Sequence, residues 1–150
     1  MIPVHQTRFG LPDGNCLTAC LASLLELQDV DLPSLMREDD WVGAANRWLR
    51  DLGQPWRVLC VRVAPDSIHE LDGVLVIASG PGPRGFDHAV VWRDGQLVHD
   101  PHPDDGGIAS VTDYVLLVPL DPASLVRVPS APAATADLAG LAAREAASKP

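Results

Sequence analysis

The stretch from Gly14 to Leu27, GNCLTACLASLLEL, decides how the rest of this chain is expected to fold. Asn15 opens it with a side chain that commonly caps helix N-termini. Behind it, apolar residues recur at the three-and-four spacing of one helix face, at Leu17, Cys20, Leu21, Leu24 and Leu25. The stretch therefore predicts an amphipathic helix that begins next to Cys16 and packs against a core.

Cys16 falls in the first turn of this expected helix. Free backbone N–H groups and the positive end of the helix dipole stabilise a thiolate there, which predicts a thiol pKa below the free value of about 8.5. Such a cysteine is a candidate nucleophile. The alternative is that Cys16 is a small core residue like Cys20, which lies one turn further along.

Length and charge narrow the class of protein. The chain has 150 residues, which suits one folded domain, and its formal net charge of -9 comes from scattered acids that make a nucleic-acid partner unexpected. Three cysteines and an opening, MIPVHQTRFG, without the features of an export signal predict free thiols and a cytoplasmic protein. No apolar run approaches the roughly 20 residues of a membrane span, so no membrane association is expected.

A second helix is expected after Asp39 or Asp40, either of which can cap it. Gly53 can end this helix. Its apolar face consists of Trp41, Ala44, Ala45, Trp48, Leu49 and Leu52. We interpret the two tryptophans as core anchors rather than as ligand contacts.

The remainder of the chain changes to short β-branched runs separated by Gly, Pro and Asp. These runs predict about five strands, at residues 56–63, 73–78, 89–92, 96–100 and 112–118. Helices followed by strands indicate an α+β fold, with an antiparallel sheet covered on one side by helices. Cys60 is expected to be inert core, and SGPGPRG, residues 79–85, to form a loop at the substrate cleft.

The C-terminal part differs in composition, because Pro and Ala dominate from Pro119 onward. We place the end of the folded domain near Val128, which gives a domain at residues 1–128 and an Ala/Pro-rich tail at 129–150. A weak helix is expected at residues 136–147 within the tail.

A hairpin in the segment FDHAVVWRDGQLVHDPHPDD, residues 86–105, carries His88 on its first strand and Asp100 on its second. With Asp94-Gly95 as a two-residue turn, Ala89 faces Asp100 and His88 points to the opposite face. With a three-residue loop that starts at Arg93, His88 stands across from Asp100, whose carboxylate can then accept the imidazole Nδ1–H. Both turns suit the sequence, and we predict the three-residue loop.

Cys16, His88 and Asp100, with Gln6 upstream, are the residue types that thiol catalysis requires. A thiolate attacks, an imidazole takes and returns the proton, a carboxylate orients the imidazole, and an amide stabilises the oxyanion. With GNCLTACLASLL early and DHAVVWRDGQLVHDPHP late, the chain resembles the papain-like cysteine peptidases, in particular small bacterial and phage-borne members related to the bacteriocin-processing peptidases.

The resemblance spans about residues 3 to 118. It implies a papain-like fold and a hydrolase of peptide or isopeptide bonds in a peptide or protein substrate, with Cys16 as nucleophile, His88 as base and acid, and Asp100 as orienting residue. It also implies Gln6 as oxyanion donor, although the separation from Cys16 is longer than the family usually has; Asn15 or backbone N–H groups are the alternatives. No metal or organic cofactor is implied, and the oligomeric state stays open.

Three other interpretations remain. His99 and His102 with Cys16 and Cys20 offer zinc-ligand types, but the prolines between and after the two histidines are atypical of a zinc site. His5 and His69 are interpreted as ordinary surface histidines. The same fold can also be catalytically silent and act as a binding or structural protein, or it can act as an acyltransferase or amidase with the same triad.

Overall fold

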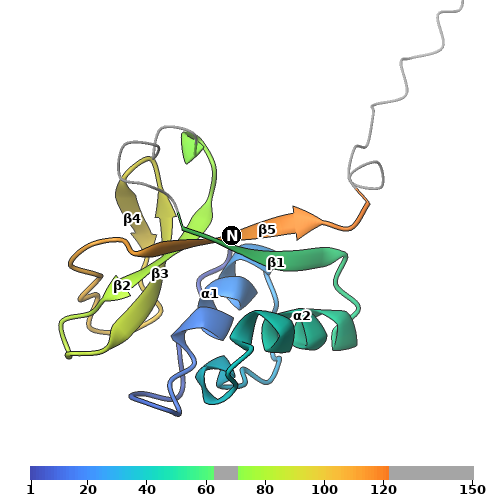
Figure 1. Ribbon diagram of the computed structural model, residues 1–150, viewed down its shortest axis with the longest axis horizontal. Helices are drawn as coiled ribbons and strands as arrows, with labels where there is room; N and C mark the ends of the chain where they lie inside the picture. Colours follow the sequence, from blue (N-terminus) through green and yellow to red (C-terminus); the bar gives the residue numbers. More distant parts are fainter. Residues whose placement is uncertain (63–70, 122–150) are drawn as a thin grey trace, which may run out of the picture. The chain divides into compact units, whose positions relative to one another are not determined.

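A computed structural model of the chain describes residues 1–62 and 71–121. Two helices, α1 (Cys16–Leu25) and α2 (Trp41–Asp51), are separated by a short 3-10 helix, η1 (Leu35–Arg37). Five strands follow, β1 (Trp56–Val61), β2 (Val76–Pro81), β3 (Asp87–Arg93), β4 (Gln96–His99) and β5 (Asp113–Pro119). Within the described ranges this order confirms the predicted α+β class (Figure 1).

The chain divides into one unit at Met1–Leu120 and a second at Asp121–Pro150. The domain end that the sequence suggests near Val128 and the weak helix at residues 136–147 lie outside the described residues, as does His69. All the helices and strands named above belong to the first unit.

The five strands form one sheet in the order β1-β5-β2-β3-β4, and every neighbouring pair is antiparallel. Residues alternate between the two faces of a strand. On β3, Ala89 and Val91 pack in the core with both helices, whereas Val90 packs in a second cluster with Ile108 and Val111 from the segment before β5. Helices therefore cover one face, and an irregular segment covers part of the other.

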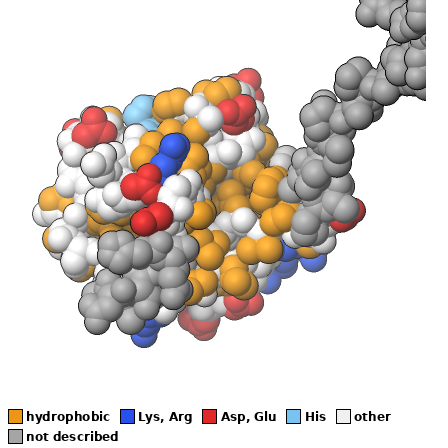
Figure 2. Space-filling view, turned by 90° about the horizontal axis from the view of Figure 1, so that it is seen from above, with side chains coloured by type: hydrophobic (Ala, Val, Ile, Leu, Met, Phe, Trp, Pro, Cys, Tyr) orange, Lys and Arg blue, Asp and Glu red, His pale blue; other side chains and the backbone are white. Residues whose placement is uncertain are grey.

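Exposed apolar side chains remain on the face of β1 and β5 that points away from the helices. Leu59 and Val118 are examples, and their neighbour Val58 on the other face of β1 is buried in the core. Figure 2 shows hydrophobic side chains gathered on the face of the molecule seen from above.

Helix α1 is buried along its whole middle part, from Leu17 through Ser23, rather than along a single stripe. The N-terminal segment covers the side that does not face the sheet. Val4 donates its backbone N–H to the Ser23 hydroxyl at 2.9 Å and packs beside Ala19 and Ala22. The small residues between the leucines allow this close approach, which a leucine-rich surface would prevent.

The expected cap at Asn15 is wrong, because this side chain makes no hydrogen bond to the first turn of α1. Its Oδ1 accepts the backbone N–H groups of Thr7 and Arg8, each at 3.0 Å, and its Nδ2 donates to the Leu32 carbonyl at 2.9 Å. The buried amide thus joins the N-terminal segment to the connection after α1. The cap predicted at Asp40 is confirmed, since its Oδ1 accepts the Gly43 N–H at 2.9 Å.

Cys60 lies on β1 as predicted, but it is exposed rather than core. The hydrogen bonds between α2 and β1 are made by Asn46 with the backbone of Val58, two residues earlier. Because β1 is an edge strand and the helix covers it near Val58, the Cys60 side chain is left in contact with water.

The expected loop at residues 79–85 is only partly a loop. Ser79, Gly80 and Pro81 are the end of β2 and pair with Ala89, His88 and Asp87. A side chain at Gly80 would not fit, because a Cβ there would lie 1.9 Å from the Ser110 carbonyl oxygen. Gly80 is therefore required because two backbone segments approach closely at this point of the strand.

The predicted three-residue loop of the β3–β4 hairpin is also wrong. Arg93 pairs with Gln96, and the two turn residues have positive φ, 51° at Asp94 and 77° at Gly95. However, a bulge follows at once, because Trp92 pairs with Leu97 and Val91 pairs with His99. The extra residue shifts the pairing by one and returns Asp100 to the same face of the hairpin as His88.

Gly95→Val is expected to destabilise the protein by roughly 1–2 kcal/mol, because a β-branched residue is strained at positive φ. Urea denaturation measures this change. Asp94→Asn is the matched control at the other turn position, where asparagine tolerates the left-handed conformation, and it should leave the midpoint nearly unchanged. An unchanged midpoint in Gly95→Val would contradict the positive φ of Gly95.

Candidate functional site

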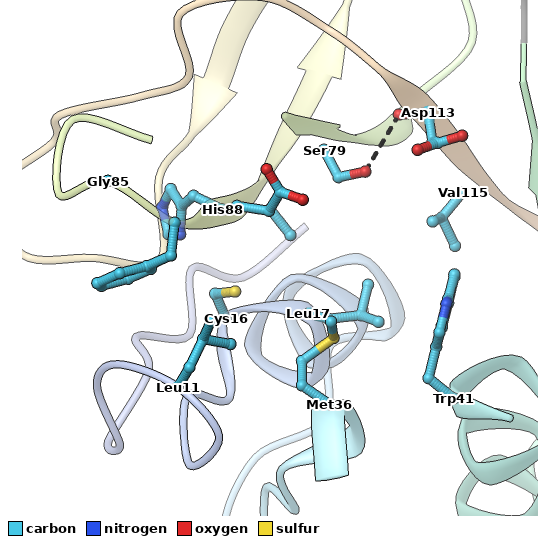
Figure 3. Close-up of a pocket in the computed structure, with 13 residues that line it drawn as sticks. Leu11, Cys16, Leu17, Met36, Trp41, Ser79, Gly85, His88, Asp113 and Val115 are labelled. Atoms are coloured by element: carbon cyan, nitrogen blue, oxygen red, sulfur yellow. Dashed lines mark hydrogen bonds between the residues drawn. The ribbon is translucent and has the colours of Figure 1, made fainter. Parts of the chain in front are cut away.

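A pocket of about 450 Å³ opens between the start of α1, the connection to α2 and the ends of β2, β3 and β5. Cys16, the first residue of α1, and His88, the second residue of β3, both line it (Figure 3). Most of its other side chains are apolar. The remaining lining residues are Leu11, Leu17, Met36, Trp41, Ser79, Gly85, Phe86, Asp87, Ala89, Asp113 and Val115.

His88 is held by Asp100 through a hydrogen bond of 2.7 Å between Nε2 and Oδ1. Both side chains are buried, with 5% and 0% of their surfaces exposed. The contact between the two residues is the one expected, but the nitrogen is not, because the sequence argument assigns Nδ1 to this bond. With Nε2 committed to Asp100, Nδ1 is the ring nitrogen left for other partners.

Asp100 accepts two further hydrogen bonds from the backbone. Its Oδ1 accepts the N–H of His102 at 2.8 Å, and its Oδ2 accepts the N–H of Gly107 at 2.7 Å. Burial by itself raises the pKa of the Asp100 carboxyl, but these donors and the His88 side chain outweigh it, so its pKa lies below the ordinary value. The carboxylate is therefore charged and fixed in orientation.

Cys16 is partly buried, and this burial raises the pKa of its thiol above the ordinary value. Backbone hydrogen bonds at Ala89, at Leu17 and at Cys16 itself act in the opposite direction without reversing it, and the charge of Asp100 raises the pKa further. The lowered pKa expected from the helix N-terminus is therefore wrong for the resting protein. Burial therefore opposes ionisation of the Cys16 thiol.

Gln6 lies beside the Asp100 segment, since its backbone N–H donates to the Pro101 carbonyl at 2.9 Å. Its side chain is buried but does not line the pocket. Nε2 donates to the Arg8 carbonyl at 3.1 Å, and Oε1 has no hydrogen-bond partner in the described part of the chain. The oxyanion role of Gln6 stays a prediction.

The sequence argument did not identify His102 and Phe9 as part of the site. The His102 ring is buried and lies edge-on to His88, with ring centroids 6.4 Å apart, and Phe9 packs edge-on to His102 at 5.0 Å. His102 Nδ1 accepts the Asp104 N–H at 3.1 Å. The sequence argument considered His102 as a zinc-ligand type and as a substitute for Asp100, and nothing in the local sequence marks Phe9.

Trp41 and Met36 were also missed as pocket residues. The Trp41 side chain packs against the core as predicted, yet it also forms part of the pocket wall. Met36 belongs to η1, which the sequence pattern did not predict. The apolar stripe of α2 was therefore the only sequence signal for this wall, and it does not distinguish a core face from a pocket face.

The side chains considered as zinc ligands are not grouped around a possible metal position in the described part of the chain. Among residues 1–62 and 71–121, no three His, Cys, Asp or Glu side chains are arranged to hold a metal ion. His99 Nε2 contacts the Val4 carbonyl at 3.0 Å, and the exposed His5 contacts the Pro101 carbonyl at 3.3 Å. These two histidines therefore join the N-terminal segment to the end of the hairpin.

Comparisons with family models, with curated proteins and with solved structures give no match for this chain. No helix in the described ranges is long and apolar enough to cross a membrane. The functional argument therefore depends on the geometry of the pocket itself.

Asp100→Asn is expected to lower the free energy of unfolding by about 1–3 kcal/mol at pH 7, because the charged acceptor of three donors is lost. Since the folded pKa of Asp100 lies below its unfolded value of about 3.9, its contribution is full above that pH and is lost as pH falls through the folded pKa. Denaturation curves should therefore show the difference between the two proteins shrinking below about pH 4.

Asp29→Asn is the control for that experiment, because Asp29 is exposed. Its stability should follow the original protein at every pH. A difference between Asp100→Asn and the original protein that stays constant from pH 7 to 3 would contradict the lowered pKa.

Alkylation of Cys16 by iodoacetamide should keep accelerating as pH rises past the free thiol pKa of about 8.5, because burial raises the pKa of this thiol. The reaction is followed by peptide mass mapping in a Cys60→Ser background, which removes the exposed thiol. The fully buried Cys20 should react much more slowly and serves as the internal control. A rate plateau below pH 8 would show that a thiolate predominates instead.

Proposed function

We propose that this protein is a thiol-dependent hydrolase of peptide or isopeptide bonds, with Cys16 as nucleophile, His88 as general base and acid, and Asp100 as the residue that orients His88. The observation that carries the proposal is a buried His88–Asp100 hydrogen bond at the edge of a pocket that Cys16 also lines. The papain-like fold is part of the proposal. It is supported by a cysteine that opens the first helix, followed by an antiparallel sheet with the histidine on β3.

The reaction begins with a neutral thiol. His88 Nδ1 takes the Sγ proton as the sulfur attacks the substrate carbonyl carbon, and the tetrahedral intermediate carries the negative charge on the former carbonyl oxygen. His88 returns the proton to the leaving amine as the C–N bond breaks, which leaves a thioester on Cys16. A water molecule, deprotonated by His88, then attacks the thioester, releases the carboxylic acid and restores the thiol.

Asp100 acts throughout as an acceptor and does not take the proton. Its two backbone donors, His102 and Gly107, keep the carboxylate in place while it holds the Nε2–H of His88. An imidazolium formed during the reaction is stabilised by this adjacent negative charge. Because burial raises the pKa of the Cys16 thiol, the sulfur becomes nucleophilic when His88 removes its proton.

Two candidates remain for the hydrogen-bond donor to the oxyanion. Asn15 is excluded, because both of its amide hydrogens already bond to Thr7 Oγ1 and the Leu32 carbonyl. What remains is the second amide hydrogen of Gln6 or the backbone N–H groups in the first turn of α1, which the Asn15 side chain does not cap.

A catalytically silent binding protein is the second candidate, and the raised pKa of Cys16 is the observation that favours it. An acyltransferase would use the same triad but pass the acyl group to an amine, and an amidase would cleave a non-peptide amide. The proposal includes a cytoplasmic location and a peptide or protein substrate.

Cys16→Ser and Cys20→Ser form a matched pair on one helix. Cys16→Ser should abolish hydrolysis of a mixture of fluorogenic peptide amides and leave the urea midpoint unchanged, since the sulfur is the reacting atom. Cys20→Ser should retain hydrolysis but lose about 1–3 kcal/mol of stability, because Cys20 is fully buried in the apolar core and the smaller, more polar serine side chain packs less well there. Its thiol lies 3.4 Å from the Ala89 carbonyl. Hydrolysis that persists in Cys16→Ser would sink the assignment.

A further inference from the structure

A second, much smaller pocket lies on the face of the sheet that the helices do not cover. Val76 of β2, Trp92 of β3 and Tyr114 of β5 border it and pack together there. About 10 Å³ of the pocket is open to the centre of a water-sized sphere, so it has room for one water molecule and not for a larger ligand. The remaining lining residues are Leu71, Asp72, Val74, Asp94 and Gly95.

Trp92 and Tyr114 reach this pocket from the two strands on either side of β2. Trp92 pairs with Val76, and Tyr114 pairs with Ala78, two residues further along β2. Because residues two apart on a strand share a face, both aromatic side chains stand on the face of Val76. The strand register therefore brings an indole and a phenol to the border of the same small space.

Each of these two aromatic side chains has a buried donor. Tyr114 is only 4% exposed, and neither its hydroxyl nor Trp92 Nε1 has a hydrogen-bond partner within residues 1–62 and 71–121. Burial also raises the pKa of the Tyr114 hydroxyl, which therefore stays protonated at neutral pH. Buried donors in native proteins nearly always find an acceptor, either in the protein or in an ordered water.

The carboxylates of Asp72 and Asp94 complete the polar lining. Asp94 already accepts the Gly73 N–H through Oδ1, which ties the turn before β2 to the turn between β3 and β4. An anion in this pocket would be repelled by the two carboxylates, and a cation could not accept the indole N–H. Water accepts and donates, so it suits both kinds of neighbour.

We propose that this pocket is the binding site of one structural water molecule. Its oxygen accepts hydrogen bonds from Trp92 Nε1 and the Tyr114 hydroxyl, and its hydrogens are donated to the carboxylates of Asp72 and Asp94. The water thus links β3 and β5 to the turn before β2. The site is independent of the proposed thiol chemistry, because none of its residues lines the pocket of Cys16 and His88.

Nuclear magnetic resonance of the isotope-labelled chain tests for this water, after the indole signals of the four tryptophans are assigned. A retained water gives cross peaks to the indole N–H that have opposite signs in NOESY and ROESY spectra, whereas surface water or hydrogen exchange gives equal signs. We expect opposite signs at Trp92. Trp48 is the control, because its Nε1 donates directly to the Asp31 carbonyl at 3.2 Å. Equal signs or no cross peak at Trp92 would overturn the proposal.

Tyr114→Phe removes one of the two donors and keeps the aromatic ring. The water then loses a partner, so the Trp92 indole hydrogen should exchange with deuterated water about 2–10-fold faster, the equivalent of one hydrogen bond. Thr112→Val removes an exposed hydroxyl two residues away and outside the pocket, and it should leave this rate unchanged. A Tyr114→Phe rate equal to that of the original protein would contradict a shared water.

A crystal structure of the unaltered chain gives a test that does not depend on the folding of any variant. Density for one water molecule within about 3.2 Å of both Trp92 Nε1 and the Tyr114 hydroxyl oxygen is expected. A direct hydrogen bond between the two side chains, or an acceptor supplied by another residue of the chain, would show that the site holds no water and would overturn the proposal.

Discussion

The buried carboxylate of Asp100 is the constraint on which the site depends. A charge without water must be surrounded by donors, and here the three donors come from two segments: His88 on β3, and the backbone of His102 and Gly107 after β4. Satisfying one carboxylate therefore fixes the imidazole and also the path of the chain that follows. That segment continues to Ile108 and Val111, which cover the second face of the sheet. One loop therefore supplies both the backbone hydrogen bonds to Asp100 and apolar side chains that cover the second face of the sheet.

The same segment is joined to the helix that carries the cysteine. Gln6 donates its backbone N–H to Pro101, directly after Asp100, and Asn15, directly before Cys16, accepts from Thr7 and Arg8. The N-terminal segment thereby links the start of α1 to the end of the hairpin, although the two are far apart in sequence. The relative position of the thiol and the His88–Asp100 pair therefore depends on one backbone hydrogen bond and on the buried Asn15 side chain, which accepts two backbone N–H groups.

Burial has opposite outcomes for the two acidic groups of the site. Asp100 has enough donors to stay ionised, whereas Cys16 has too few to offset the loss of water, so burial raises its pKa. The carboxylate is charged at rest and the thiol is not. This division suits a mechanism in which the nucleophile is generated only when the oriented imidazole takes its proton, and it leaves the apolar pocket without a resting ion pair at its centre.

The sequence by itself determined the order and type of the two α-helices and the five strands, because periodicity is a local property. The apolar spacing of both helices, the cap at Asp40, the alternating strands and the choice of Cys16, His88 and Asp100 as candidates all follow from neighbouring residues. The local pattern was not sufficient for the β3–β4 hairpin. The predicted turn was one residue too long, and the His88–Asp100 contact arises instead from a bulge that restores the same face.

Only the tertiary structure decided how these elements were used. In the structure, the Asn15 side chain joins two segments instead of capping α1, β2 continues through Gly80 and Pro81, and Cys60 is exposed. It also made Trp41 a pocket wall. Each outcome depends on what lies across space from a residue, through burial, close backbone approach or a distant donor. A local pattern of residue types contains none of that information.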